Sequence, residues 1–252
     1  MPELLGLPYS PWSEKARWAL EVRRVPFRSR HYQPIVGEPA LRLKLRRPFG
    51  NVTVPVLTTD DGRVLADSWD IARWADERGE GPRLFPAEHE AKIRRFVELS
   101  ERGLGAGRTS SLKRMLEDDE ALAEMVPRGL RKALGKAAAR VGEFGIRRTL
   151  RKYSRSGAGE SPEAVQRQVL GELRAALSPD RSRSGTLLGS FTFADIAMAQ
   201  VLVYVEPPSS GLKLAPASRK NFGDPALREA YGDLVRWRDD LYAAHRLAPA
   251  KA

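Results

Sequence analysis

The chain has 252 residues, 42% of them hydrophobic and 30% charged, which is typical of a soluble globular protein with one large domain or two ordinary ones. It contains no cysteine, which excludes disulfides, zinc–thiolate sites and a thiol nucleophile carried by the protein itself. The net charge is +11, and much of the excess lies in residues 128–155, which we interpret as solvated helix faces and not as a nucleic-acid surface.

Membrane insertion and metal chemistry find little support in the sequence. The longest apolar run, residues 196–205, has about half the length that a membrane span needs. The chain opens without a signal-like segment, so we expect a cytoplasmic protein. The three histidines, His31, His89 and His245, are scattered, so we expect neither a metal site nor a Ser-His-Asp triad.

The first eighty residues alternate strand-like and helix-like segments. The expected strands are residues 4–7, 27–32, 53–57 and 63–66. The expected helices are residues 10–24, 38–47 and 69–78. Between the last two strands, Asp61-Gly62 is a strong signal for a tight hairpin turn. The order βαβαββα predicts a four-stranded mixed sheet covered by helices.

The pattern changes after residue 80, because Gly and Pro residues interrupt it and only helical patterns follow. We therefore expect an α/β domain over residues 1–80, a linker over 81–88 and an all-helical domain over 89–252. The expected helices of this second domain include residues 88–115, 163–177, 192–205 and 225–245, together with basic helices between 117 and 155. Three glycines at 103, 105 and 107 indicate either a kink or a close approach of another segment.

Ser10 is the first candidate for chemistry, because it precedes Pro11 at the expected start of a helix. A hydroxyl beside a helix N-terminus suits an anionic ligand such as a thiolate. It also serves as an ordinary helix cap, and the turn alone leaves both interpretations open.

Val54-Pro55 is the second candidate, because proline removes a hydrogen bond from a strand that should be central. A cis peptide would turn the Val54 backbone outward, where it could pair with a peptide-like ligand. A trans proline at the first residue of the strand is the alternative.

Asp67 and Ser68 form the third candidate, immediately after a strand and at the start of a helix. Together they offer a carboxylate for an ammonium group, and a hydroxyl with a helix N-terminus for a carboxylate. Capping alone would also account for them. A TxxD box, Thr192 to Asp195, precedes the apolar helix of the second half and is interpreted as a structural cap.

These signals, in this order, resemble the soluble glutathione S-transferase family. Ser10-Pro11-Trp12 is similar to the Ser-Pro-Phe active-site turn of the tau class, and Val54-Pro55 with the following Val-Leu is similar to the family's Val-Pro-x-Leu segment with its cis proline.

The two later signals extend the resemblance over nearly the whole chain. Asp67-Ser68 followed by Ile71 is similar to the Glu/Asp-Ser-x-x-Ile element that holds the γ-glutamyl group of glutathione. Residues 191–196 resemble the Thr-x-Ala-Asp folding box of the helical domain. Thr53 departs from the pattern, because tau-like enzymes usually have a lysine there that contacts glutathione.

The resemblance implies a thioredoxin-like domain followed by an all-helical domain, a homodimer, and glutathione as co-substrate without a metal. It implies glutathione binding by Val54, Pro55, Asp67 and Ser68. Ser10 would donate a hydrogen bond to the thiolate, with Tyr9 or Ser13 as alternative hydroxyls. Tyr9 and Trp12 would line the apolar site of the second substrate.

The predicted function is a glutathione transferase that activates the thiolate for attack on a small, apolar electrophile. One alternative is a binding module of the same fold without catalysis, and another is a glutathione-dependent isomerase or dehalogenase. Glutathione-dependent disulfide reduction is disfavoured, because residue 10 is Ser and the chain has no cysteine.

Overall fold

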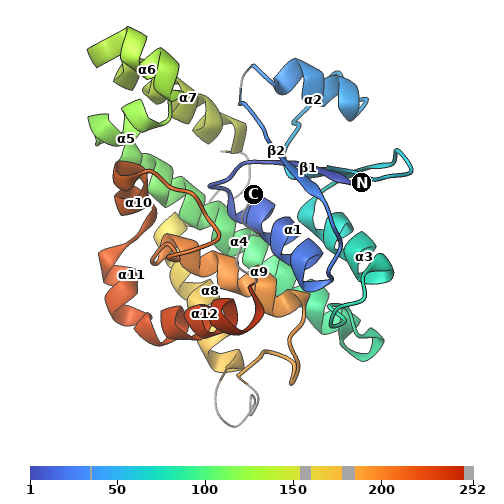
Figure 1. Cartoon of the computed structure of the whole chain (residues 1–252). Coiled ribbons are helices and arrows are strands. Elements are labelled where there is room, and N and C mark those ends of the chain that lie inside the picture. Colours follow the sequence, from blue (N-terminus) through green and yellow to red (C-terminus); the bar gives the residue numbers. More distant parts are fainter. Residues whose placement is uncertain (35, 154–159, 178–184, 247–252) are drawn as a thin grey trace.

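The structure, a computed structural model, describes residues 1–34, 36–153, 160–177 and 185–246. Within these residues the chain forms a four-stranded mixed sheet of order β2-β1-β3-β4, with a mostly helical second half beside it (Figure 1). The strands are β1 Glu3–Gly6, β2 Arg28–His31, β3 Val56–Thr58 and β4 Val64–Ala66. β1 pairs in parallel with β2 and antiparallel with β3, and β3 pairs antiparallel with β4. The predicted βαβαββα order is confirmed.

Three helices cover the sheet on its two faces (Figure 1). They are α1 Pro11–Val22, α2 Glu38–Lys44 and α3 Ser68–Arg78. Leu4 and Leu57 face α1 and α3, whereas Val56 faces α2 and packs with Leu41. This alternation follows from the period of two in a strand, which sends successive side chains to opposite faces. The hydrophobic residues of these strands are therefore buried on the face to which the strand geometry directs them.

The hairpin between β3 and β4 forms where Asp61-Gly62 predicts it. Gly62 has φ +82°, a conformation that glycine adopts without a steric penalty, and its N–H donates to Thr59 O at 3.1 Å. β3 itself begins only at Val56, three residues later than predicted, because Pro55 has no N–H to give to the ladder.

Every regular element in the described part of the second half is a helix. Its α-helices are α4 Glu90–Met115, α5 Asp119–Glu124, α6 Arg128–Leu134, α7 Ala138–Tyr153, α8 Pro162–Ala176, α9 Phe193–Val201, α10 Pro216–Phe222, α11 Pro225–Ala230 and α12 Gly232–His245. Short 3-10 turns lie at η1 Ala87–His89, η2 Gly135–Ala137 and η3 Leu202–Tyr204. The single helix predicted for residues 225–245 is wrong in one detail, since it breaks at Tyr231 into α11 and α12.

Helix α9 lies at the centre of the second half, and all nine of its residues are buried. Its N-terminus is held by the TxxD capping box: Asp195 accepts hydrogen bonds from the backbone N–H groups of Leu187 and Thr192, each at 2.8 Å. Capping of this kind satisfies N–H groups that a buried helix start would otherwise leave without partners. The predicted structural role of this box is confirmed.

The glycines of α4 mark a close approach and not a kink. A Cβ at Gly103 would lie 2.8 Å from Val201 of α9, and a Cβ at Gly107 would collide with the ring of Tyr204. Gly105 faces open space. α4 therefore packs against α9 and η3 at a distance that only glycine permits at two positions.

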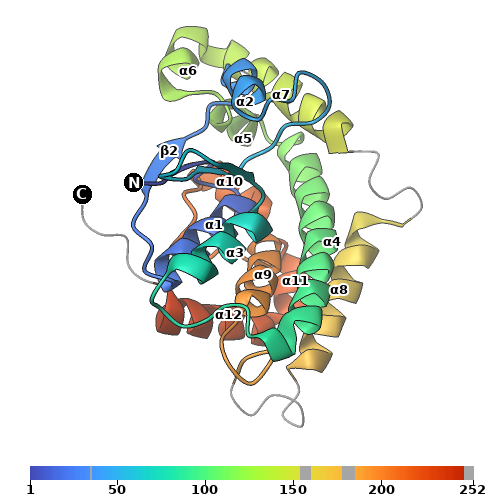
Figure 2. The same cartoon turned by 90° about the vertical axis from the view of Figure 1, so that its right-hand side faces the viewer.

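The largest hydrophobic cluster of the described residues contains side chains from both halves of the chain. Trp18 of α1 is fully buried, lies 4.5 Å from the ring of Tyr242 in α12 and donates from its indole N–H to His245 O at 3.0 Å. Figures 1 and 2 both show α1 alongside α9 and close to α12. None of the described helices combines the length and hydropathy that a membrane-crossing segment requires.

Candidate functional site

Sheet topology brings the first three sequence candidates to one edge. Since β1 and β4 both run antiparallel to β3, the ends of β1 and β4 lie beside the start of β3. Ser10 follows β1, Val54 precedes β3 and Asp67 follows β4. Segments far apart in sequence therefore present polar groups to one small region.

Ser10 occupies the N-cap position of α1, with extended backbone angles of φ −91° and ψ 124°. Its carbonyl accepts the first helical hydrogen bond, from Glu14 N at 3.0 Å, and Pro11 takes the first helical position. The expectation that its hydroxyl caps the helix is wrong, because the side chain makes no capping hydrogen bond. The half-buried hydroxyl therefore stays available beside the positive end of the helix.

The other two hydroxyls of this turn are in different environments. Ser13 is fully buried, and its Oγ accepts a hydrogen bond from Leu7 N at 3.0 Å, so it fixes the turn between β1 and α1. Burial, reinforced by the neighbouring phenol of Tyr32, raises the pKa of Tyr9 to about 12. Tyr9 is therefore a protonated hydrogen-bond donor at neutral pH, whereas Ser13 is engaged in a structural contact.

The Val54–Pro55 peptide bond is cis, which agrees with the first of the two sequence interpretations. Among the described residues, no hydrogen bond engages the backbone N–H or C=O of Val54. Val54 is half-buried at the start of β3. These backbone groups can therefore pair with an extended peptide-like ligand.

Asp67 caps α3 and has an unusual backbone. Its φ of 143° lies in a region that non-glycine residues seldom adopt, and such strain tends to cluster at functional sites. Its Oδ1 accepts from Trp69 N at 2.6 Å. Loss of hydration raises the pKa of this carboxyl, the Trp69 N–H opposes that shift, and the nearby carboxylate of Glu101 adds to it. Ser68, the first residue of α3, is buried.

Helix α4 contributes Glu101, which sequence reasoning missed. Glu101 forms an ion pair with Lys15, a fully buried residue of α1, and accepts a hydrogen bond from the indole N–H of Trp12 at 2.7 Å. Trp12 is therefore held in place beside the Ser10 turn. The sequence contains no signal that tells which face of α4 meets α1.

Arg108, two turns further along α4, also contacts Trp12. Its guanidinium carbon is 4.9 Å from the centre of the Trp12 ring and 3.5 Å from that of Tyr153 in α7. Cations favour the faces of aromatic rings, so these contacts hold Arg108 at the boundary between the α1 turn and α7.

Helix α7 reaches across to the first half of the chain. Lys152 donates to Val52 O at 2.7 Å, and Arg148 pairs with Glu38 of α2 at 2.9 Å. Figure 2 accordingly shows α7 beside α2. The interpretation of residues 128–155 as solvated faces alone is therefore wrong for these two side chains. Residues 154 and 155 lie outside the described part.

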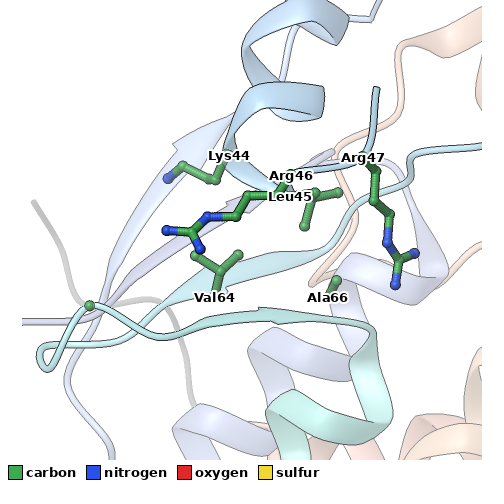
Figure 3. Close-up of a pocket in the computed structure, with 7 residues that line it drawn as sticks. Lys44, Leu45, Arg46, Arg47, Val64 and Ala66 are labelled. Carbon is green, nitrogen blue, oxygen red and sulfur yellow. The ribbon is translucent and has the colours of Figure 1, made fainter. Parts of the chain in front are cut away.

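A basic pocket lies next to this edge, between the end of α2 and strand β4 (Figure 3). Its lining includes Lys44, Arg46 and Arg47, together with Val64 and Ala66, and no acidic residue of the described ranges is among it. In Figure 3 the Arg47 side chain extends toward the end of β4, near Ala66, whereas Lys44 and Arg46 point toward the hairpin.

Residues 9–78 match the family model described as the N-terminal domain of glutathione S-transferases. The first part of the chain therefore carries a glutathione S-transferase N-terminal domain. A probable glutathione S-transferase of Solanum tuberosum is 30% identical over 95 residues, which are 37% of this chain and 42% of that protein. The alignment thus spans less than half of this relative.

Solved glutathione S-transferases share the whole fold. The enzyme of Ceriporiopsis subvermispora, in complex with glutathione, has a TM-score of 0.65 and 20% identity, with 99% of both chains covered. The one from Methylobacillus flagellatus, with glutathione bound, has a TM-score of 0.57 and 19% identity, covering 96% of this chain and 95% of its own. The predicted fold class, a thioredoxin-like domain followed by helices, is thereby confirmed.

Proposed function

We propose that this protein is a glutathione transferase, in which residues 1–80 hold glutathione and the helices of residues 89–252 complete the second-substrate site across a linker at 81–88. The convergence of Ser10, Val54 and Asp67 at one sheet edge carries the proposal. Each of the three presents a polar group to that edge: an unused hydroxyl, an unpaired backbone segment and a carboxylate. These groups match the thiol, peptide backbone and γ-glutamyl end of glutathione.

Glutathione would lie along Val54 in the antiparallel sense. Its ammonium group would pair with Asp67, and its γ-glutamyl carboxylate would meet Ser68 and the N-terminus of α3. Thr53 cannot supply the lysine contact of tau-like enzymes, and Arg47 of the basic pocket would bind the glycyl carboxylate instead. The likeness of the Ser10 turn to the tau class remains part of this proposal.

The chemistry requires a thiolate. A hydrogen bond from the Ser10 hydroxyl and the positive end of α1 both favour thiolate over thiol, as they do for reactive cysteines. The sulfur then attacks an electrophilic carbon of the second substrate, forming a C–S bond while the leaving group departs with its electron pair. Trp12 and Tyr9 would border the electrophile. We further propose a cytoplasmic homodimer, as the resemblance to glutathione S-transferases suggests.

Isomerisation is the second candidate function. A maleylacetoacetate isomerase of Anaeromyxobacter dehalogenans with bound glutathione has a TM-score of 0.51, 20% identity, and coverage of 99% of this chain and 92% of its own. An isomerase would regenerate glutathione, whereas a transferase consumes it. The amount of glutathione consumed per product therefore separates the two functions.

Ser10→Ala tests the proposal, with Ser161→Ala as a matched control. Ser161 also precedes a proline at a helix start, but its hydroxyl does cap, accepting from Ala164 N at 3.1 Å. We expect Ser10→Ala to lower turnover of 1-chloro-2,4-dinitrobenzene by about ten- to a hundredfold, with retention on immobilised glutathione preserved. Ser161→Ala should keep full activity and lose about 1 kcal/mol of stability. Unchanged turnover in Ser10→Ala would refute the assignment.

A further inference from the structure

Arg108 has no anionic partner in the described part of the chain. Its guanidinium contacts two aromatic rings, those of Trp12 and Tyr153, and no carboxylate, carbonyl or hydroxyl of the described residues accepts a hydrogen bond from it. Arg108 is half-buried, and its side-chain nitrogens remain accessible to solvent. The two rings hold this partly dehydrated guanidinium in place, and its N–H groups are therefore available to donate hydrogen bonds to a ligand.

The acidic groups nearby are already engaged with other cations. Glu101 is held by Lys15 and by the indole of Trp12. Glu38 is shared between Arg148 at 2.9 Å and Arg42 at 2.7 Å. Neither carboxylate is therefore free to neutralise Arg108.

Lys152 adds further positive charge to the same wall. It donates to the carbonyl of Val52, a neutral group, and its aromatic neighbour is again Tyr153. Burial lowers the pKa of Lys152, and the charges of Arg148, Arg42 and Arg108 lower it further, against the opposing effect of Glu38. The wall between α4, α7 and the α1 turn thus carries an uncompensated positive charge.

The position of Arg108 distinguishes it from the groups that would hold glutathione. Asp67 and Val54 lie at the sheet edge, whereas Arg108 lies against the ring of Trp12 on the side of α4 and α7. Trp12 is two residues beyond Ser10, so Arg108 borders the space that an electrophile would enter.

We propose that the second substrate is an organic anion, an electrophile with a carboxylate that binds the guanidinium of Arg108. The inference rests on the proposed transferase function and names its substrate class. A carboxylate matches the planar fork of arginine and can accept two parallel hydrogen bonds from it. The rings of Trp12 and Tyr153 hold the fork in position, which reduces the entropy that binding must overcome.

A matched pair of substrates tests the proposal: 4-chloro-3,5-dinitrobenzoate and its methyl ester. In both, the glutathione sulfur forms a bond to the carbon bearing chlorine, and chloride leaves with the bonding electrons. Rates are divided by the uncatalysed rate for each compound, because the ester is the more reactive electrophile. The wild-type protein should favour the carboxylate by about ten- to a hundredfold in normalised kcat/KM.

The variants identify the group responsible. Arg108→Gln should abolish the preference by raising KM for the carboxylate alone, and Arg108→Lys should restore part of it. Arg95→Gln, an 80% exposed arginine on the same helix, is the control and should keep the preference. The pH profile with the ester should be the same in wild type and Arg108→Gln, because Arg108 binds the substrate and not the thiolate.

The outcomes separate the two proposals. If neither compound is turned over, the transferase function is refuted. If the ester is turned over but the carboxylate is not preferred, or if Arg108→Gln impairs both compounds equally or shifts the pH profile, the inference about the second substrate is refuted while the transferase function stands.

Discussion

The Ser10 hydroxyl is unusual for an N-cap because it leaves the helix end uncapped. Asp67, Asp118, Ser161 and Asp224, which also precede helices, each accept a backbone N–H. A capping hydrogen bond would stabilise α1, so its absence at Ser10 makes the folded protein less stable than it could be. The same absence leaves the hydroxyl available to a ligand. Functional sites commonly sacrifice local stability in this way.

Tyr9 and Ser10 can be separated by the pH dependence of turnover. The pKa of Tyr9, about 12, lies above its ordinary value, so the phenol stays protonated up to about pH 10 and loses its proton only as the pH rises further. We expect kcat/KM to rise with pH at the same midpoint in wild type and in Tyr9→Phe, because the glutathione thiol alone titrates. Ser10→Ala should move that midpoint upward. A midpoint shift in Tyr9→Phe instead would make Tyr9 the thiol contact.

The sequence predicts candidate site residues that lie in a turn next to a strand. It does not predict site residues that reach the site only through tertiary packing. Ser10, Val54 and Asp67 each adjoin a strand end, and strand ends are visible in the sequence. Glu101 and Arg108 lie in the middle of a long helix, and only tertiary packing decides that this face of α4 meets Trp12. The missing capping bond of Ser10 also depends on three-dimensional placement.

At the level of elements, α4 shows why helix composition alone is ambiguous. Its three closely spaced glycines allowed a kink or a close approach, and the partners of α4 decide between them. Val201 and Tyr204 belong to a segment about a hundred positions away in sequence, so no local pattern could have placed them. Local signals did predict the caps and the hairpin turn, because those depend on neighbouring residues.

Gly107→Ala and Gly105→Ala form a matched pair on this helix. A Cβ at Gly107 collides with the Tyr204 ring, so we expect a loss of about 1–3 kcal/mol of unfolding free energy. A Cβ at Gly105 meets nothing within 4 Å, so alanine should stabilise the protein by up to about 1 kcal/mol. Urea denaturation followed by circular dichroism measures both. Equal effects at the two positions would contradict the close packing of α4 on η3.

At the scale of the whole molecule, α1 belongs to both halves. Ala16 and Leu20 face the sheet and α3, whereas Trp18 and Ala19 pack into the core around α9. The helix that carries Ser10 at its start therefore connects the two halves, and its position depends on both. The proposed division at residues 81–88 separates the chain in sequence but not in its core.

Trp18→Ala tests whether the two halves unfold together. Removing this fully buried indole from the contact with Tyr242 should cost about 3–5 kcal/mol. Because Trp18 and Ala72 of α3 belong to the same hydrophobic cluster as α9, peptides from α3 and from α9 should lose protection against hydrogen exchange by the same free energy. Leu43→Ala, at a site 81% exposed, should leave both unchanged. Loss of protection in α3 while α9 keeps its own would show that the halves are independent, and the shared core would then contribute little to the placement of the Ser10 turn.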